Sequence, residues 1–275
     1  VLFRSQRLVA QRRIADEASA HALLAAADRV ACTAMSVVAH MTYARRIDRS
    51  GCPLGSDDFK QTPEGHTGGS LNMVPAFVGY LLANALTGTT RGWLMGQGHC
   101  VAAIEAVNAL TGDVSAAQRG RYDRSEAGLS RLIEDFYSYA IDKQGRPAVP
   151  LGSHAGPNTA GAISEGGYLG FAGLQYVHTP LPGESLVAFL SDGAFEEHRG
   201  SDWAPRWWRA EDCGFAIPVM ILNGRRIEQR TQIVQEGGAT WLAEDLRHNG
   251  FDPVIVDGRD PMAIAWAIVE AEDTL

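Results

Sequence analysis

The 275-residue chain has few cysteines, and they follow no pairing pattern. There is no CxxC pair and no Cys/His spacing typical of a zinc site, which excludes a disulfide-rich secreted domain and a zinc finger. We therefore expect reduced, buried thiols in a cytoplasmic protein. The four cysteines are Cys32, Cys52, Cys100 and Cys213.

The chain also lacks an excess of basic residues. It has 24 Lys and Arg against 32 Asp and Glu, a formal net charge of −8 at pH 7. Nucleic acids and anionic membrane surfaces both require a basic face, so we expect neither as a partner. No secretory leader and no apolar run of transmembrane length is evident, which predicts no membrane span.

Both ends of the chain are unusual for a natural domain. Residues 1–6, VLFRSQ, lack an initial Met and are interpreted as a non-native remnant. The last helical pattern is followed by neither a capping Gly nor a further strand, so we expect the domain to be truncated at its C-terminus.

What the sequence does contain is an alternation of strands and helices. We expect a helical N-terminal segment over 7–62 and an α/β domain over 63–275. Alternation of strand and helix predicts a parallel sheet flanked by helices. Glycine-rich residues 146–170 predict a functional loop. Apolar spacing predicts helices over 7–47, 71–86, 97–110, 129–141, 168–178, 239–248 and 261–271, and strands over 92–96, 186–190, 217–222 and 253–256.

Two polar residues each follow an apolar strand of this pattern. Asp192 ends the strand over 186–190, and Asn223 ends the next strand along the chain. In parallel sheets, ligands bind beyond the carboxyl ends of the strands. An Asp, an Asn amide oxygen and one backbone carbonyl suit Mg²⁺. The alternative is that both residues only form turns.

Four segments narrow these alternatives, because each resembles a segment of the phosphoketolases that act on xylulose 5-phosphate and fructose 6-phosphate. They are GHTGGSLN (65–72), GQGH (96–99), GSHAGPNTAGAISEGGYLG (152–170) and GFDPVIVDGRDP (250–261). Transketolases share the architecture but match 154–170 less well. The resemblance implies the α/β fold of a thiamine diphosphate-binding, diphosphate-type domain.

The resemblance also implies a cofactor site containing thiamine diphosphate and Mg²⁺. Asp192, Asn223 and the backbone carbonyl of Arg225 would bind Mg²⁺. Glycines would allow the backbone to approach the cofactor diphosphate closely. These are Gly166, Gly167 and Gly193.

Three histidines are the catalytic residues that the resemblance implies: His66, His99 and His154. Histidine donates or accepts protons near neutral pH. The implied reaction cleaves a ketose phosphate and passes a two-carbon unit to inorganic phosphate, giving acetyl phosphate and an aldose phosphate. The glutamate that activates the cofactor belongs to a pyrimidine-binding domain absent from this chain. We therefore expect half of a site that a homodimer completes.

The sequence departs from the phosphoketolase pattern at three positions. Ser191 replaces Gly, Ala194 replaces Glu and Ser164 replaces His. Transketolase-type transfer, ketose-phosphate epimerisation and a non-catalytic cofactor-binding or assembly module therefore remain alternatives. Glu196 or Glu197 can replace the missing acid or be a solvated helix charge. The pair Arg225 and Arg226 can bind a phosphate or simply be exposed.

Overall fold

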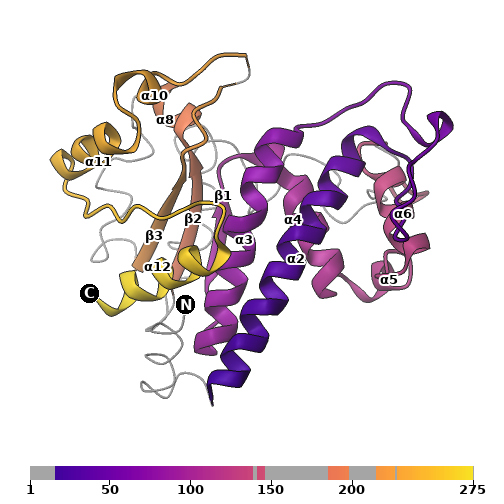
Figure 1. Cartoon of the computed structure of the whole chain (residues 1–275), viewed down its shortest axis with the longest axis horizontal. Coiled ribbons are helices and arrows are strands. Elements are labelled where there is room, and N and C mark those ends of the chain that lie inside the picture. The colour runs from indigo at the N-terminus through magenta and orange to yellow at the C-terminus, as the bar shows by residue number, and fades with distance from the viewer. Residues whose placement is uncertain (1–15, 139–140, 146–184, 198–214, 227, 275) are drawn as a thin grey trace. The chain divides into compact units, whose positions relative to one another are not determined.

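The computed structural model describes residues 16–138, 141–145, 185–197, 215–226 and 228–274 (Figure 1). The chain divides into two compact units. The first comprises Val1–Leu23, Gly79–Gly98 and Ala155–Leu275, and the second comprises Leu24–Val78 and His99–His154. Each unit is described by itself.

A parallel sheet forms the centre of the first unit. Its strands are β1 (Gly92–Met95), β2 (Ser185–Ser191) and β3 (Phe215–Ile221), in the order β1-β2-β3. The five central residues of β2 are buried, as expected for a strand covered on both faces. Pro218 lies in β3, which has a described neighbour on one side only, a position that tolerates proline. The predicted parallel sheet flanked by helices is confirmed.

Helices and strands share the core of this unit. The helix α11 (Ala239–His248) packs Leu242 and Leu246 against Leu94, Leu186 and other apolar residues of the sheet. The last helix, α12 (Pro261–Asp273), begins with an Asp260 side chain that accepts from the Met262 N–H. Two shorter helices, α8 (Asp192–Glu197) and α10 (Gln232–Glu236), lie beyond the carboxyl ends of the strands (Figure 1).

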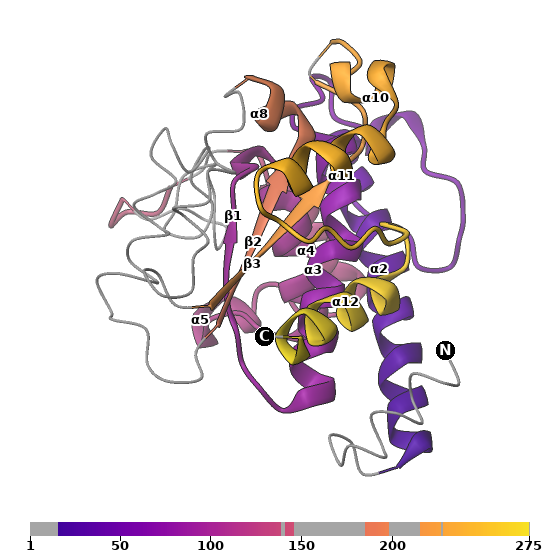
Figure 2. The same cartoon turned by 90° about the vertical axis from the view of Figure 1, so that its left-hand side faces the viewer.

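The strand expected over 253–256 does not form, so that prediction was wrong. Residues 251–257 have no regular structure and run from α11 toward α12 (Figure 2). Val254 and Ile255 are 67% and 62% exposed, whereas a buried strand would cover both. The apolar run is only four residues long, and Pro253 has no N–H to donate to a neighbouring strand. The apolar pattern alone was therefore too short to predict a strand.

A buried ion pair links three segments of the first unit. Arg91 lies before β1, and its Nε donates to Glu272 Oε1 of α12 at 2.6 Å. A second guanidinium nitrogen donates to the other carboxylate oxygen of Glu272. Ser185, at the start of β2, also donates to Glu272 Oε1, at 2.9 Å. The pattern of the sequence had not predicted this pair.

The helix α3 (Thr67–Thr87) contacts α12 at a glycine. A Cβ on Gly79 would lie 2.8 Å from the Ile264 Cβ and 2.9 Å from the Pro261 carbonyl oxygen. We therefore expect Gly79→Ala to lower the free energy of unfolding by about 1–3 kcal/mol, because neither neighbour can move without repacking the helices. Urea denaturation measures this loss.

Gly68, in the first turn of the same helix, is the matched control. A Cβ there has no neighbour within 4 Å. Gly68→Ala should therefore leave the stability unchanged or raise it by up to about 1 kcal/mol through helix propensity. Equal effects at the two glycines would contradict the close packing at Gly79.

The second unit is helical. The expected helix over 7–47 is observed as one continuous helix, and residues 7–15 lie outside the described part of the chain. Residues 112–125 contain one short helix over 116–119. The elements that lie wholly or partly in this unit are α2 (Glu17–Tyr43), η1 (Ser56–Asp58), α3, η2 (Gly98–Cys100), α4 (Val101–Thr111), α5 (Ala116–Arg119) and α6 (Glu126–Asp135).

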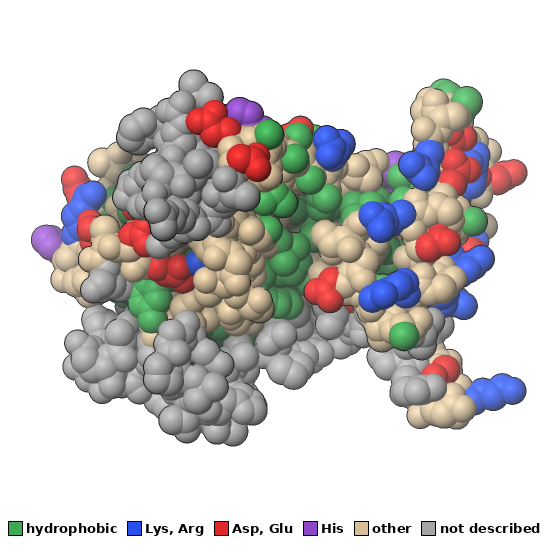
Figure 3. All heavy atoms as spheres, turned by 90° about the horizontal axis from the view of Figure 1, so that it is seen from below, with side chains coloured by type: hydrophobic (Ala, Val, Ile, Leu, Met, Phe, Trp, Pro, Cys, Tyr) green, Lys and Arg blue, Asp and Glu red, His purple; other side chains and the backbone are tan. Residues whose placement is uncertain are grey.

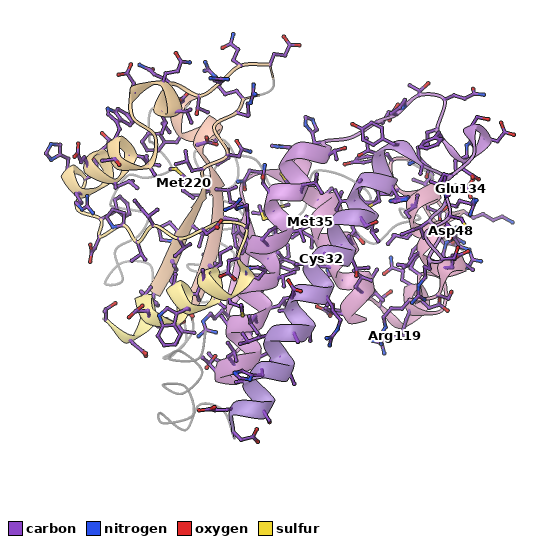
Figure 4. The ribbon with its side chains drawn as sticks, viewed as in Figure 1. Cys32, Met35, Asp48, Arg119, Glu134 and Met220 are labelled. Atoms are coloured by element: carbon purple, nitrogen blue, oxygen red, sulfur yellow. The ribbon has the colours of Figure 1, made fainter. Side chains whose placement is uncertain are left out.

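In the described part of the chain, two helices are long and apolar enough to cross a membrane, which the sequence had not suggested. These are α2 and α3, and 67% of the most apolar window of α3 is buried within the protein. Length and composition of this kind also occur in core helices of globular proteins, so they are weak indicators of a span. Cys32 and Met35 lie on α2 (Figure 4).

Charged side chains of both signs are interspersed on the face shown in Figure 3. Lys and Arg stand next to Asp and Glu there, instead of forming one continuous basic area.

Candidate functional site

The carboxylate of Asp192 organises the loops beyond β2 and β3. Asp192 is fully buried, and its Oδ2 accepts from the Gly224 N–H at 2.8 Å and the Thr231 hydroxyl at 3.3 Å. Its Oδ1 accepts from the Gly193 N–H at 3.0 Å. Since Gly224 follows β3, the structure brings the ends of the two strands together, as the sequence predicted.

The other two predicted ligands lie in the same loop. Asn223 Oδ1 accepts from the Arg225 N–H at 2.9 Å, which forms an Asx turn. The Arg225 carbonyl oxygen lies 3.4 Å from the position that a Cβ on Gly193 would occupy. Three oxygen donors and Gly193 therefore gather at one sheet edge. The turn-forming role of Asn223 is directly visible in this geometry.

The donor set fits a divalent cation. Burial raises the pKa of the Asp192 carboxyl, and hydrogen bonds from the Gly224 and Gly193 N–H groups offset part of the increase. Within the described ranges, no ion pair involves Asp192. A buried carboxylate without a counter-ion favours a bound cation, and carboxylate, amide and carbonyl oxygens are ligands of Mg²⁺.

A site for a softer metal is not evident in the same part of the chain. The residues that the structure describes contain no group of three or more His, Cys, Asp or Glu able to hold a metal ion.

Two residues near Asp192 clarify the departures from the phosphoketolase pattern. The Ser191 hydroxyl accepts from the Ala194 N–H at 3.1 Å at the start of α8. Ser191 has no positive φ, so serine replaces glycine there without backbone strain. Glu196 is not a solvated charge: its side chain is 9% exposed, and its Oε1 accepts from the Ile233 N–H of α10 at 2.6 Å.

The two arginines of this loop differ. Arg226 lies 3.8 Å from Glu196 and donates to Gln229 Oε1 at 2.9 Å, so it has partners within the protein. Arg225 is exposed. Of the pair, Arg225 is therefore the one more available to a ligand.

Two of the three predicted catalytic histidines meet in the second unit. The rings of His66 and His99 have centroids 4.7 Å apart at an interplanar angle of 59°. His66 precedes α3, and His99 lies in η2 before α4. A Cβ on Gly69 would lie 3.1 Å from the His99 Nε2 and 2.9 Å from the Cys100 sulfur. The glycine therefore leaves the space that the His99 ring occupies.

The remaining predicted site residues lie outside the described residues. These are His154, Gly166 and Gly167, together with the departure at Ser164. Sequence reasoning in turn missed Thr231, a buried partner of Asp192. Its polar surroundings in the sequence carry no signal that could have identified it.

The cysteines differ in exposure, and the expectation that all are buried was wrong for Cys32 and Cys52, which are exposed. Burial raises the pKa of the Cys100 thiol to about 12. At pH 8 we expect iodoacetamide to alkylate Cys100 at least about 100-fold more slowly than Cys32, because the thiolate is the nucleophile. Mass spectrometry of the folded and urea-unfolded chain measures both rates, and equal rates in the folded chain would contradict the burial of Cys100.

Comparison with known proteins relates this geometry to a family. The family described as the XFP N-terminal domain matches residues 19–275. The chain is 30% identical over 233 residues to a protein named probable phosphoketolase from Streptomyces coelicolor, covering 81% of this chain and 27% of that protein. It is 27% identical over 229 residues to probable phosphoketolase 2 of Lactiplantibacillus plantarum, covering 80% and 27%.

A third relative, a probable phosphoketolase of Pseudomonas putida, is 27% identical over 232 residues, covering 81% of this chain and 27% of that protein. The chain thus spans 27% of the length of these relatives. The family match covers nearly the whole chain and includes both the strand ends at Asp192 and Asn223 and the histidine pair. The chain belongs to the phosphoketolase N-terminal domain family.

Proposed function

We propose that this chain is the diphosphate-binding part of a phosphoketolase-type lyase that uses thiamine diphosphate and Mg²⁺. The complete enzyme would cleave xylulose 5-phosphate or fructose 6-phosphate and transfer the two-carbon unit to inorganic phosphate. The products would be acetyl phosphate and an aldose phosphate. We further propose a homodimer and a cytoplasmic location.

The observation that supports this proposal is the buried carboxylate of Asp192, which has no ion-pair partner among the described residues and lies among further oxygen donors. Asp192, Asn223 and the Arg225 carbonyl would hold Mg²⁺, which would bind the cofactor diphosphate. Gly193, whose missing Cβ keeps the Arg225 carbonyl accessible, would let the backbone approach that diphosphate. Gly166 and Gly167 are proposed to do the same.

Bound thiamine diphosphate supplies a nucleophilic carbon and accepts the electron pair of the broken carbon–carbon bond. The chain itself provides proton transfer and substrate binding. His66 and His99 lie ring to ring, with centroids 4.7 Å apart. We propose that they and His154 bind the sugar hydroxyls and exchange protons with them.

Calorimetric titration with thiamine diphosphate tests the binding step. We expect a heat of binding with Mg²⁺ present and none when EDTA removes the metal. Absence of binding at millimolar cofactor would overturn the proposal and favour the non-catalytic module.

Product analysis of the complete enzyme tests the reaction. With xylulose 5-phosphate and inorganic phosphate, acetyl phosphate is the expected product. Two-carbon transfer to an added aldose without acetyl phosphate would show transketolase-type chemistry, and an epimeric ketose phosphate would show epimerisation. Either result would reject the phosphoketolase reaction while retaining the cofactor site.

A further inference from the structure

Lys60 ties together the ends of two helices in the second unit. Its ammonium group donates to the Met41 carbonyl of α2 at 2.6 Å. It also donates to the carbonyls of Ile133 and Phe136, at the end of α6, at 3.1 and 3.2 Å. Cations near helix C-termini are favourable because they satisfy carbonyls that the helix leaves free. These contacts fix the turn at Phe136–Tyr137.

Tyr137 has an unusual backbone in that turn. Its φ is 61°, and it is the one non-glycine residue with a positive φ in the described ranges. The left-handed region is costly for a tyrosine, so the surroundings must hold it there. Its ring packs edge to face on that of Phe136, with centroids 4.3 Å apart and an interplanar angle of 77°.

The Tyr137 ring occupies the space beside Gly65. A Cβ on Gly65 would lie 2.2 Å from the Tyr137 Cε2, and the φ of Gly65 is +114°. Both features require glycine there. On the other side of His66, the Thr67 hydroxyl donates to the Thr42 hydroxyl of α2 at 2.8 Å. The backbone of His66 is therefore held at both of its neighbours.

The surroundings of the Tyr137 side chain include a cavity. Tyr137 lines a cavity of about 270 Å³ together with Arg45, Lys60, Glu64 and other residues, including Glu134 of α6 (Figure 4). Glu64, the residue before Gly65, lines the same cavity as Tyr137. We therefore expect the position of the loop at Gly65 to depend on the Tyr137 ring beside it.

We propose that Tyr137 is a positioning residue for His66: its left-handed backbone places its ring against Gly65 and so keeps the His66 imidazole beside that of His99. The positional claim stands on these contacts. Only its consequence for turnover rests on the proposed function of His66.

Nuclear Overhauser effects between the two imidazole rings test the positional claim in the chain without cofactor or substrate. Tyr137→Gly removes the ring and suits the left-handed backbone, so we expect the fold to remain and the effect between His66 and His99 to disappear. Tyr137→Phe keeps the ring and should keep the effect. If the nuclear Overhauser effect between His66 and His99 persists in Tyr137→Gly, the proposal is overturned.

Further variants distinguish loss of the ring from misfolding and from general backbone strain. Tyr137→Asn also tolerates the left-handed region and should behave as Tyr137→Gly does. Gly65→Ala should lose the effect, whereas Gly51→Ala, with φ +82° and no neighbour within 4 Å of its Cβ, should keep it. Loss in Gly51→Ala as well would attribute the result to backbone strain and reject the role of the ring.

Kinetics of the complete enzyme then separate position from catalysis. We expect Tyr137→Gly to lower kcat about 100-fold, as displacement of a reacting group does, with little change in KM or cofactor affinity. Tyr137→Phe should restore kcat. Loss of the ring contact with unchanged kcat would support the positioning role and reject the proposed catalytic role of His66. An unchanged contact would reject the positioning role whatever the kcat.

Discussion

We expect Arg91→Met to lower the free energy of unfolding by about 3–5 kcal/mol. The Arg91 side chain is only 1% exposed, and its removal leaves the Glu272 carboxylate without its counter-ion. The guanidinium also donates to the Asn84 side chain at 3.0 Å, so that side chain loses a partner too. Urea denaturation followed by circular dichroism measures the loss.

An exposed ion pair of the same unit provides the control. Arg259 pairs with Asp257 at 2.8 Å, but its side chain is 89% exposed. Arg259→Met should therefore change the stability far less than Arg91→Met. The double variant Arg91→Met with Glu272→Met should recover part of the stability, because no buried charge is left unpaired. A small effect for Arg91→Met would show that water reaches this pair.

We expect Asp192→Asn to weaken the Mg²⁺-dependent binding of thiamine diphosphate by more than about 100-fold. Loss of a residue that only hydrogen-bonds to a metal ligand lowers metal affinity by roughly 10–100-fold, and Asp192 is proposed to be a ligand itself. Asparagine has nearly the same shape and keeps one acceptor for the Gly224 N–H, but it removes the buried negative charge. The fold should therefore persist, and circular dichroism checks this. Calorimetry with and without Mg²⁺ measures the affinity.

Two other substitutions serve as comparisons for Asp192→Asn. Thr231→Val removes one hydroxyl that donates to Asp192 Oδ2 and keeps the carboxylate, so its effect should fall within the smaller range. Asp257→Asn changes an exposed aspartate of the same unit and should leave cofactor affinity unchanged. Unaltered Mg²⁺-dependent affinity in Asp192→Asn would remove Asp192 from the proposed ligands.

The sequence predicted those elements whose pattern is local. The helix over 239–248 is observed with the same limits, because apolar positions at helical spacing follow two glycines. Two apolar runs that end in polar turn residues became the neighbouring strands β2 and β3. The strand predicted over 253–256 does not form, because a strand also needs a neighbouring strand to pair with, and a pattern of four residues cannot specify that neighbour.

Features that depend on distant contacts were not predictable in this way. Arg91 and Glu272 are 181 residues apart in the sequence, and each alone has the pattern of a surface charge. The candidate ligands Asp192 and Asn223 were predictable because strand ends and parallel pairing place them together. The backbone of Tyr137 was not, since tyrosine carries no preference for the left-handed region.

The pairing of β1 has a consequence for how the chain folds during synthesis. Gly92 pairs with Leu186, whereas the described helices of the second unit are complete once residue 135 has been made. A growing chain can therefore form those helices while β1 still has no neighbouring strand. The sheet, and with it the loops around Asp192, must await residues 185–221, which supply β2 and β3. Because such long-range contacts form slowly, assembly of the sheet is the step most exposed to competing association on the ribosome.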